Sequence, residues 1–315
     1  MIAAGVSQLF QTLLVVVLAP LLVGWVNQCR AWLQNRTGPG ILQPYRSLRK
    51  LFIKEAVLAS NASGLFRASP YIQFGSMALA ASIVPILATN LPFAHAADVI
   101  ALVGIFATAR MFLALAAMDV GTAFGSMGAR REMLVACLAE PALLMVFFTP
   151  SLISQSTSLP TMVETLARSH LILYPSMAFA GAAFLMVLLA ENARIPVDNP
   201  ATHLELTMIH EAMILEYSAR HLALIEWAAA MKLTTYMSIG FALFVPWGIV
   251  KAGDWYAAPF ALPALLLKLL CAGAGLALLE MVSAKMRIFR APEFLGTAFL
   301  LGVLGMLIHG LLERG

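Results

Sequence analysis

The densest group of side chains able to move protons lies between residues 191 and 218. This stretch holds five carboxylates, which are Glu191, Asp198, Glu205, Glu211 and Glu216. Large apolar residues separate them, which is unusual for a solvated loop. Partial burial disfavours charging neighbouring carboxylates together, so such a group can take up and release protons. The segment is therefore either a proton relay or an acidic loop clamped to a partner.

The prolines of this stretch indicate where its helices end. Pro196 stops the preceding helix, and Asn199-Pro200 starts a new segment. If residues 202–217 form one helix, Glu205 and Glu216 lie about 20° from the same face and about 16 Å apart along its axis. In that case one stripe carries two carboxylates. The two histidines do not have a zinc-binding spacing, and no metal site is predicted.

A second group of charges includes Asp119, Arg130, Arg131, Glu132 and Glu140. Glu140 lies about seven residues inside an apolar stretch, too deep for a routine surface carboxylate. It either carries protons or caps a neighbouring backbone group.

Three basic residues also fall inside apolar stretches, where an ionisable group usually faces a partner or a wet cavity. They are Arg110, Lys232 and Lys268. Lys232 and Lys268 are expected to line an interior polar path. Arg110 is either part of such a path or a side chain that snorkels to the interface.

The elements that position these groups are expected to be transmembrane helices. The chain has 315 residues, of which 61% are hydrophobic and 11% charged, against about 25% charged in an average soluble domain. Its mean hydropathy is +0.87. Continuous apolar runs of about 20 residues match a helix that crosses the bilayer and differ from the short alternating segments of a barrel. The three cysteines are expected to be packing residues.

The fold class is therefore all-α, a polytopic integral membrane protein of about eight transmembrane helices plus an amphipathic interface helix. Residues 1–315 form a single transmembrane domain, and the first span is expected to be retained. The spans are expected at 5–26, 70–92, 98–118, 133–154, 170–191, 225–250, 259–282 and 293–312.

Lysine and arginine divide these loops into two sets. The odd loops carry most of them, including Arg36, Arg130, Arg220 and Arg290, whereas the even loops and termini carry Arg168, Lys251 and Arg314. The positive-inside rule then places the odd loops in the cytoplasm and both termini outside. This asymmetry accounts for the basic pI without a nucleic-acid partner.

The first odd loop combines a turn with a basic helix. Gly38-Pro39-Gly40 is a turn signal, and apolar residues recur at Tyr45, Leu48 and Leu51 with basic residues between them. This pattern predicts an amphipathic helix at the cytoplasmic interface, which either anchors to lipid headgroups or docks a partner.

These segments together resemble a known family, the membrane-anchor subunit shared by respiratory complex I and membrane-bound [NiFe] hydrogenases. The hydrogenases include formate hydrogenlyase and hydrogenase-4 complexes. The matching residues are Arg36, Gly38, Pro39, Gln43, Lys50, Leu51, Gly128, Ala129, Arg131, Glu140, Glu191, Arg194, Pro196, Asp198, Glu205, Glu216, Tyr217 and Ser218. The compact stretch from Gly38 to Arg46 is similar to the hydrogenase branch. Ser47, Ala201 and His203 depart from the family pattern.

The resemblance implies a non-catalytic membrane subunit of an oxidoreductase complex, which couples electron transfer to proton or sodium movement in a bacterial or archaeal cytoplasmic membrane. Its expected partners are the [NiFe] hydrogenase large and small subunits, iron-sulfur subunits and antiporter-like membrane subunits. The nickel-iron centre and iron-sulfur clusters belong to those partners, and this chain binds no cofactor. The implied proton path comprises Glu140, Glu191, Asp198, Glu205, Glu211, Glu216, Lys232, Lys268 and Glu280, with Arg131 and Arg194 as charge partners. The implied docking loop comprises Arg36, Gly38, Pro39, Gln43, Tyr45, Arg46 and Lys50.

Three other functions are compatible with the same residues. A complex I subunit lining a quinone tunnel shares the scaffold. A stand-alone secondary ion transporter needs no partner. A structural anchor needs none of the carboxylates.

Overall fold

The structure is a computed structural model that describes residues 2–89, 91–168, 174–198, 208–251, 258–284, 286 and 290–313. Helices dominate these residues. The long ones are α1 (Ile2–Leu33), α3 (Gly64–Ile83), α4 (Val99–Asp119), α5 (Ala123–Ser154), α7 (Pro175–Glu191), α9 (Ala219–Phe244), α10 (Ala258–Val282) and α11 (Ala291–Ile308). The short elements are α2 (Gln43–Ile53), α6 (Leu159–Arg168), α8 (His210–Ile214), η1 (Pro92–Ala96), η3 (His309–Glu313), β1 (Ala88–Thr89) and β2 (Val250–Lys251).

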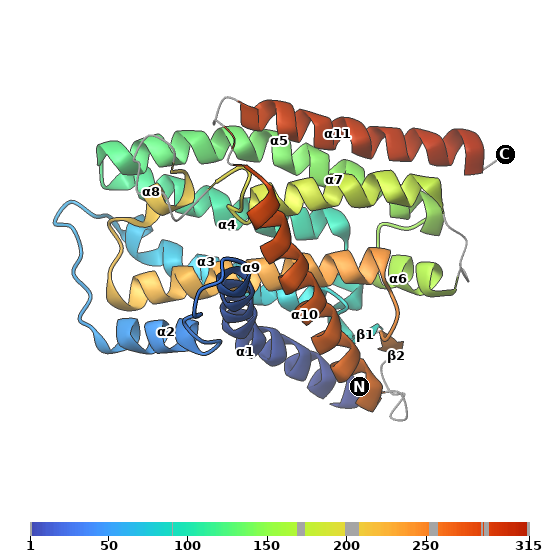
Figure 1. Ribbon diagram of the computed structural model, residues 1–315, viewed down its shortest axis with the longest axis horizontal. Coiled ribbons are helices and arrows are strands. Elements are labelled where there is room, and N and C mark those ends of the chain that lie inside the picture. The colour runs from blue at the N-terminus through green and yellow to red at the C-terminus, as the bar shows by residue number, and fades with distance from the viewer. Residues whose placement is uncertain are drawn as a thin grey trace.

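Most long helices run side by side along the long axis of the molecule, and α1 and α10 cross them obliquely (Figure 1). Helix α11 packs on α5 and α7, while α3 lies against α4 and α9. Helix α1 packs on α10 and α9. Helices α4, α5, α7 and α9 therefore surround the interior that holds the candidate site.

The two ends of the bundle differ. Helices α2 and α8 lie at one end, on the left in Figure 1, whereas α6 and the short parallel pair β1 and β2 lie at the other. The start of α1 and the end of α11 also lie at the α6 end. The first and the last long helix thus have their outer ends at the same end of the bundle.

Each of the eight expected spans overlaps one of the long helices. By length and composition, five helices of the described residues are long and apolar enough to cross a membrane: Gly5–Leu33, Val99–Asp119, Ala123–Ser154, Phe260–Val282 and Ala291–Leu311. Helix α7 is apolar but shorter, with 17 residues. The mainly helical fold and its membrane character are confirmed.

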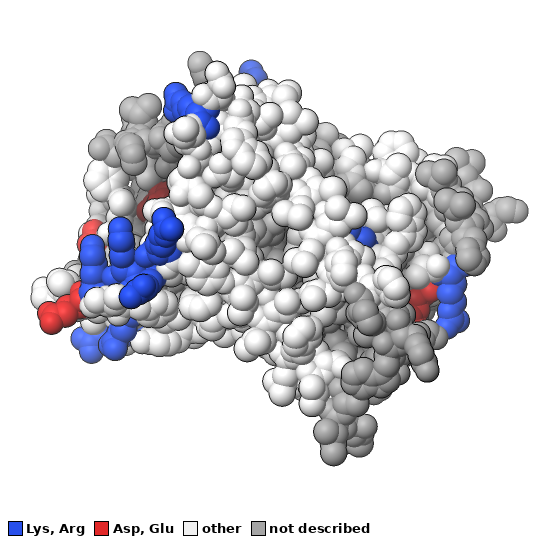
Figure 2. Space-filling view, turned by 60° about the horizontal axis from the view of Figure 1, so that its bottom comes forward, with Lys and Arg blue, Asp and Glu red and all other residues white. Residues whose placement is uncertain are grey.

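Helix α2 confirms the expected amphipathic element. Leu48 is buried, whereas Arg46, Arg49 and Lys50 are exposed. Figure 2 shows basic side chains gathered at the left end, which is the α2 end of Figure 1, while the middle of this face is almost free of charge. This distribution is that of a protein with an apolar belt and one basic rim.

The connection between the spans expected at 133–154 and 170–191 contains α6, which buries Leu159, Met162 and Val163 against the bundle. One local prediction is wrong. The cysteines were expected to pack inside, but of the three only Cys29 is buried, and Cys137 and Cys271 are exposed. An apolar run in a membrane helix does not reveal which side faces lipid, because both sides are apolar.

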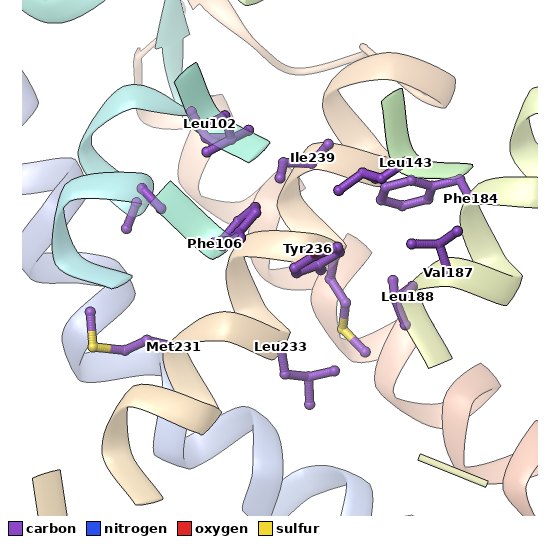
Figure 3. Close-up of a cluster of buried hydrophobic side chains, with 14 of the residues drawn as sticks. Leu102, Phe106, Leu143, Phe184, Val187, Leu188, Met231, Leu233, Tyr236 and Ile239 are labelled. Carbon is purple, nitrogen blue, oxygen red and sulfur yellow. The ribbon is translucent and has the colours of Figure 1, made fainter. Parts of the chain in front are cut away.

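The core beside the candidate site is aromatic. Tyr236 of α9 stacks on Phe106 of α4, with ring centroids 4.7 Å apart, and lies near Phe184 of α7. Leu102, Leu143 and Ile239 surround this stack (Figure 3). These residues lie between the candidate site and the α6 end of the bundle.

Candidate functional site

Arg110 is the centre of a buried ionic network that joins three helices. Its guanidinium group on α4 donates hydrogen bonds to both carboxylate oxygens of Glu191, the last residue of α7. Its Nε lies 3.6 Å from Glu132 Oε1, and its Nη1 lies 3.4 Å from Glu140 Oε1. Arg110 is 7% exposed, so it is an interior charge and not a snorkelling one.

Lys232 of α9 supplies the second cation of this network. Its Nζ lies 2.9 Å from Glu191 Oε2 and donates a hydrogen bond of 2.6 Å to the Glu191 carbonyl oxygen. The same ammonium lies 5.9 Å from the centre of the Tyr236 ring. Lys232 therefore lies in the interior polar region, as predicted.

The three carboxylates around Arg110 differ in burial. The side chain of Glu191 is 1% exposed, that of Glu132 is 14% and that of Glu140 is 34%. Glu132 and Glu140 are eight residues apart on α5, about 12 Å along a helix, so the Arg110 guanidinium bridges two turns. The network thus runs from the interior toward the outer face of α5.

A second ionic cluster ties α1 and the loop after α7 to α10. Glu280 accepts a hydrogen bond from Arg30 and another of 3.2 Å from Arg194 Nη1. The Glu280 side chain is 1% exposed. Burial lowers the pKa of Arg194, and the charge of Glu280 partly offsets this effect. Arg194 thus pairs with Glu280, and its expected effect on the proton carriers stays a prediction.

Adjoining cavities connect these clusters. A cavity of about 70 Å³ is lined by Arg110, Glu132, Glu191 and Lys232. A larger one of about 420 Å³ extends toward α2 and is lined by Arg30, Arg194, Asp198, Glu211 and Glu226. Asn192, Ala193, His210, Ile225 and Ala229 line both cavities. Polar groups therefore continue from the α2 end to the Arg110 network.

The described part of the acidic segment does not fit one continuous helix over residues 202–217, because residues 208 and 209 are not helical. Helix α8 begins at His210 and ends at Ile214, and Glu216 is exposed. Glu205 lies outside the described residues. An apolar period over mixed polar residues does not by itself reveal where a helix begins and ends in the folded protein.

Other members of the predicted set have identifiable contacts. The Asp198 carboxylate accepts hydrogen bonds from the backbone N–H groups of Ile209 and His210, at 3.3 and 3.1 Å. Arg131 Nη1 donates a 3.0 Å bond to the Met208 carbonyl oxygen. Within the part of the chain that the structure describes, Arg131 has no ion pair with a predicted carboxylate. Its expected role as a charge partner stays a prediction, because Glu205 lies outside the described residues.

Glycine and tyrosine hold this segment against the bundle. A Cβ at Gly128 of α5 would lie 2.9 Å from the Ile209 carbonyl oxygen, so glycine allows α8 to approach. Tyr217 stacks on Phe66 with centroids 4.0 Å apart, and its hydroxyl donates to the Phe66 carbonyl oxygen. Burial raises the pKa of Tyr217 to about 12. These motif residues position the carboxylates.

Lys268 lies away from the two clusters. Its Nζ donates hydrogen bonds to the carbonyl oxygens of Val245 and Trp247, just after α9. A cation at a helix C-terminus stabilises the last carbonyl groups. This contact stabilises the end of α9, and the predicted place of Lys268 on a proton path is untested.

The predicted docking loop folds back onto α1. The backbone N–H of Gly40 donates a 3.1 Å bond to Gln28 Oε1, and Tyr45 donates to the Val17 carbonyl oxygen. A Cβ at Gly24 would collide with the Ile41 carbonyl group, so glycine is required at this approach. Arg36, Pro39, Arg46 and Lys50 remain exposed, while Gln43 is partly buried.

Sequence reasoning missed Arg110 as the centre of the site and gave no role to Glu132 or Tyr236. The available signal was that Arg110 is a charged residue inside an apolar run, eight residues from the expected end of the span. Its partner Glu191 is 81 residues away. No spacing within one helix could identify that pair.

The fold and this network define a multi-pass helical membrane protein with buried ionisable groups. The chain belongs to the NADH dehydrogenase family, whose sequence model matches residues 6–310. This match confirms the family resemblance.

Two curated relatives are from Escherichia coli K12. Formate hydrogenlyase subunit 4 is 29% identical over 92% of this chain and 94% of the relative. Hydrogenase-4 component C is 34% identical over 76% of this chain and 75% of the relative. In the structure of the membrane-bound sulfane sulfur reductase, an archaeal respiratory membrane complex, one chain aligns with a TM-score of 0.78 and 18% identity. The alignment covers 96% of this chain and 99% of that chain.

Proposed function

We propose that this protein is the membrane-anchor and ion-path subunit of a membrane-bound [NiFe] hydrogenase complex of the formate hydrogenlyase or hydrogenase-4 type. The observation that carries the proposal is the Arg110 network, in which three carboxylates and two cations lie inside a membrane bundle. Burial of ionisable groups in a membrane marks an ion pathway or relay. The two hydrogenase relatives favour this branch of the family.

In this proposal protons enter from the α2 end. The cavity of about 420 Å³ is lined by charged and polar side chains that can hold water, including Asp198, Glu211 and Glu226. It adjoins the smaller cavity at Glu191, and Arg110 bridges Glu191 to Glu132 and Glu140. The carboxylates outnumber the cations, so the network can hold one proton and pass it between members.

The peripheral arm docks at the same end. Arg36, Arg46 and Lys50 are exposed on the loop that folds onto α1. In this arrangement eight helices cross the cytoplasmic membrane, the α2 end faces the cytoplasm and both termini face outside, in agreement with the positive-inside rule. The nickel-iron centre and iron-sulfur clusters reside in the docked subunits, and antiporter-like subunits lie alongside in the membrane.

The test is purification of the complex through a tag on this chain in mild detergent. Nickel, iron and hydrogen evolution in the purified complex are the expected result. A complex without nickel that reduces quinone would overturn the proposal.

The second candidate function is that of a quinone-tunnel subunit of complex I. It is favoured by the apolar lining of the larger cavity at Pro20, Val23 and Leu48. Such a cavity could admit the head of a quinone. Quinone reduction that is abolished by Val23→Trp would then identify the chain as a complex I subunit. Isolation of the chain alone, with ion transport in liposomes, would identify a secondary transporter.

A further inference from the structure

A basic patch lies where α3 and α9 begin, at the α2 end of the bundle (Figure 1). Arg67 in the first turn of α3 and Arg220 in the first turn of α9 are both exposed. The stacked rings of Phe66 and Tyr217 hold these two helix starts together. Within the described ranges, neither arginine takes part in an ion pair. The described part of the chain thus supplies two cations at this place and no counter-charge for them.

His221 lies beside this patch with an unused hydrogen-bonding atom. The residue is 3% exposed, and its Nδ1 is buried without a hydrogen-bond partner among the described residues. Its ring packs edge to face with that of Tyr71, with ring centroids 5.9 Å apart. The charges of Arg220 and Arg67 both act on His221, so these side chains form one cluster. Because buried polar atoms in proteins are nearly always hydrogen-bonded, the unused Nδ1 indicates that a further group binds here.

The cluster favours an anion with several acceptor oxygens. Guanidinium groups form paired hydrogen bonds with phosphate, and an imidazole N–H can donate a further one. The start of α9 adds to this preference, because Ser218 at its N-cap makes no side-chain capping bond and the first N–H groups of a helix attract anions. Asp119, a carboxylate near the start of α3, accepts a 2.8 Å bond from the backbone N–H of Ser63 and is in none of the described ion pairs. A phosphate group therefore matches the cluster in charge and in hydrogen bonding.

An outward-facing strip of α3 continues from this cluster along the bundle. Tyr71, Gly75 and Leu79 follow Arg67 at intervals of four residues, so they form a strip that winds slowly around the outside of the helix. Tyr71 is 51% exposed and Leu79 is 47% exposed. A Cβ at Gly75 would meet no atom within 4 Å, so the glycine leaves open space between the two larger side chains. Such a notch in an exposed apolar strip can take an acyl chain.

The depth of the cluster matches that of lipid headgroups. Arg67 lies just before the span expected at 70–92, and Arg220 lies just before the span expected at 225–250. Tyrosine side chains concentrate at this level of a membrane, and basic pockets between helices bind anionic headgroups. The ammonium group of a zwitterionic lipid would be repelled by the two arginines, whereas an anionic lipid brings no cation.

We propose that an anionic phospholipid of the leaflet at the α2 end binds to this cluster. Its phosphate group accepts hydrogen bonds from Arg67, Arg220 and His221, and one of its acyl chains lies along the strip of α3. The site does not rest on the proposed hydrogenase function, because the same lipid would reach this chain in any complex that holds it in a membrane.

The test titrates the purified chain in detergent with anionic phosphatidylglycerol and with zwitterionic phosphatidylethanolamine, and native mass spectrometry counts the bound lipid. We expect phosphatidylglycerol to bind at least about fivefold more tightly. Arg67→Gln/Arg220→Gln should lose this preference, whereas Arg67→Lys/Arg220→Lys should keep most of it. His221→Phe, which keeps a ring but removes the nitrogens, should bind phosphatidylglycerol more weakly than the unchanged chain. Equal binding of phosphatidylglycerol by the unchanged chain and the glutamine variant would overturn the proposal.

A matched control separates this site from a general effect of charge. Arg49→Gln/Lys54→Gln removes the same charge from exposed positions on α2 and directly after it. This variant should keep the preference for phosphatidylglycerol, and an equal loss in both variants would overturn the site.

Two further arms separate the lipid from other anions. Inorganic phosphate should not displace phosphatidylglycerol, because it lacks the acyl chain that the strip of α3 binds, and full displacement would overturn the lipid as the ligand. In the intact complex, loss of another subunit from the glutamine variant with unchanged lipid binding would assign the patch to an acidic protein segment and reject the proposal. Neither arm measures hydrogen evolution, so a lipid-binding chain in a complex that lacks nickel would support the site and reject the hydrogenase assignment.

Discussion

The two buried ionic clusters have equally buried central carboxylates but opposite charge balance. The side chains of Glu191 and Glu280 are each 1% exposed. Glu191 belongs to a network of three carboxylates and two cations, whereas Glu280 alone faces Arg30 and Arg194. Burial alone therefore does not distinguish a relay from a clamp.

The difference shows which arrangement can exchange protons. A network with a surplus carboxylate can hold a proton and release it without leaving an unpaired cation. Protonation of Glu280 would leave two partly buried guanidinium groups facing each other without a counter-charge, which is costly. We infer that the Arg110 network moves protons and that the Glu280 cluster holds α1, α10 and the loop after α7 together.

The largest expected effect is on stability, at the clamp. Glu280→Ala removes the buried carboxylate that two partly buried cations share, and loss of one member of a buried pair costs up to about 3–5 kcal/mol. We expect a strong fall in melting temperature in detergent and loss of the assembled complex. Glu293→Ala, at an exposed position in the first turn of α11, is the control and should change stability by at most about 0.5 kcal/mol. Equal melting of the two variants would reject the clamp.

The second largest effect expected is the coupling free energy between Arg110 and Glu191. Arg110→Gln and Glu191→Gln should each destabilise the protein, because each leaves a buried charge without its partner. The double variant should be less destabilised than the sum of the two by about 2 kcal/mol. Melting curves of the four proteins measure this energy, and strict additivity would contradict the pairing.

Glu140→Gln is expected to change the stability less than these variants but to reduce proton translocation more. Glu140→Gln keeps the shape of a partly exposed side chain, so stability should change by less than about 1 kcal/mol. Proton translocation by the complex in vesicles should fall at least about tenfold relative to electron transfer, equivalent to about 1.4 kcal/mol. Glu164→Gln, in a surface pair with Arg168 at the α6 end, is the control. Unchanged pumping in Glu140→Gln would remove Glu140 from the path.

The smallest functional effect is expected at Lys268. Lys268→Met removes the cation that binds the carbonyl groups after α9 and should cost about 1 kcal/mol. Proton translocation should remain normal, because the described contacts of Lys268 include neither ionic cluster. Lost translocation with intact stability would return Lys268 to the proton path.

The helices were easier to predict from the sequence than the ion pairs between distant residues. The length of the apolar runs predicted the long helices, because a helix needs about 20 residues to cross the bilayer. Apolar residues at helical spacing with basic residues between them predicted α2. Helix α6 and the short α8 were not predicted, since their ends depend on contacts with the bundle. Gly128 was recognised as a motif residue, but its reason is the approach of the Ile209 carbonyl group.

The sequence by itself determined that this is an integral membrane protein, that its spans are helical, and that its basic residues are concentrated in alternate loops. These properties depend on the free energy of transferring each side chain from water to lipid. Each residue contributes its own share of that free energy, whatever its distant neighbours are. Only the tertiary structure decided that Arg110 pairs with Glu191 and that Arg194 pairs with Glu280. Those partners are 81 and 86 residues apart in the chain, and helix packing alone determines which distant side chains meet.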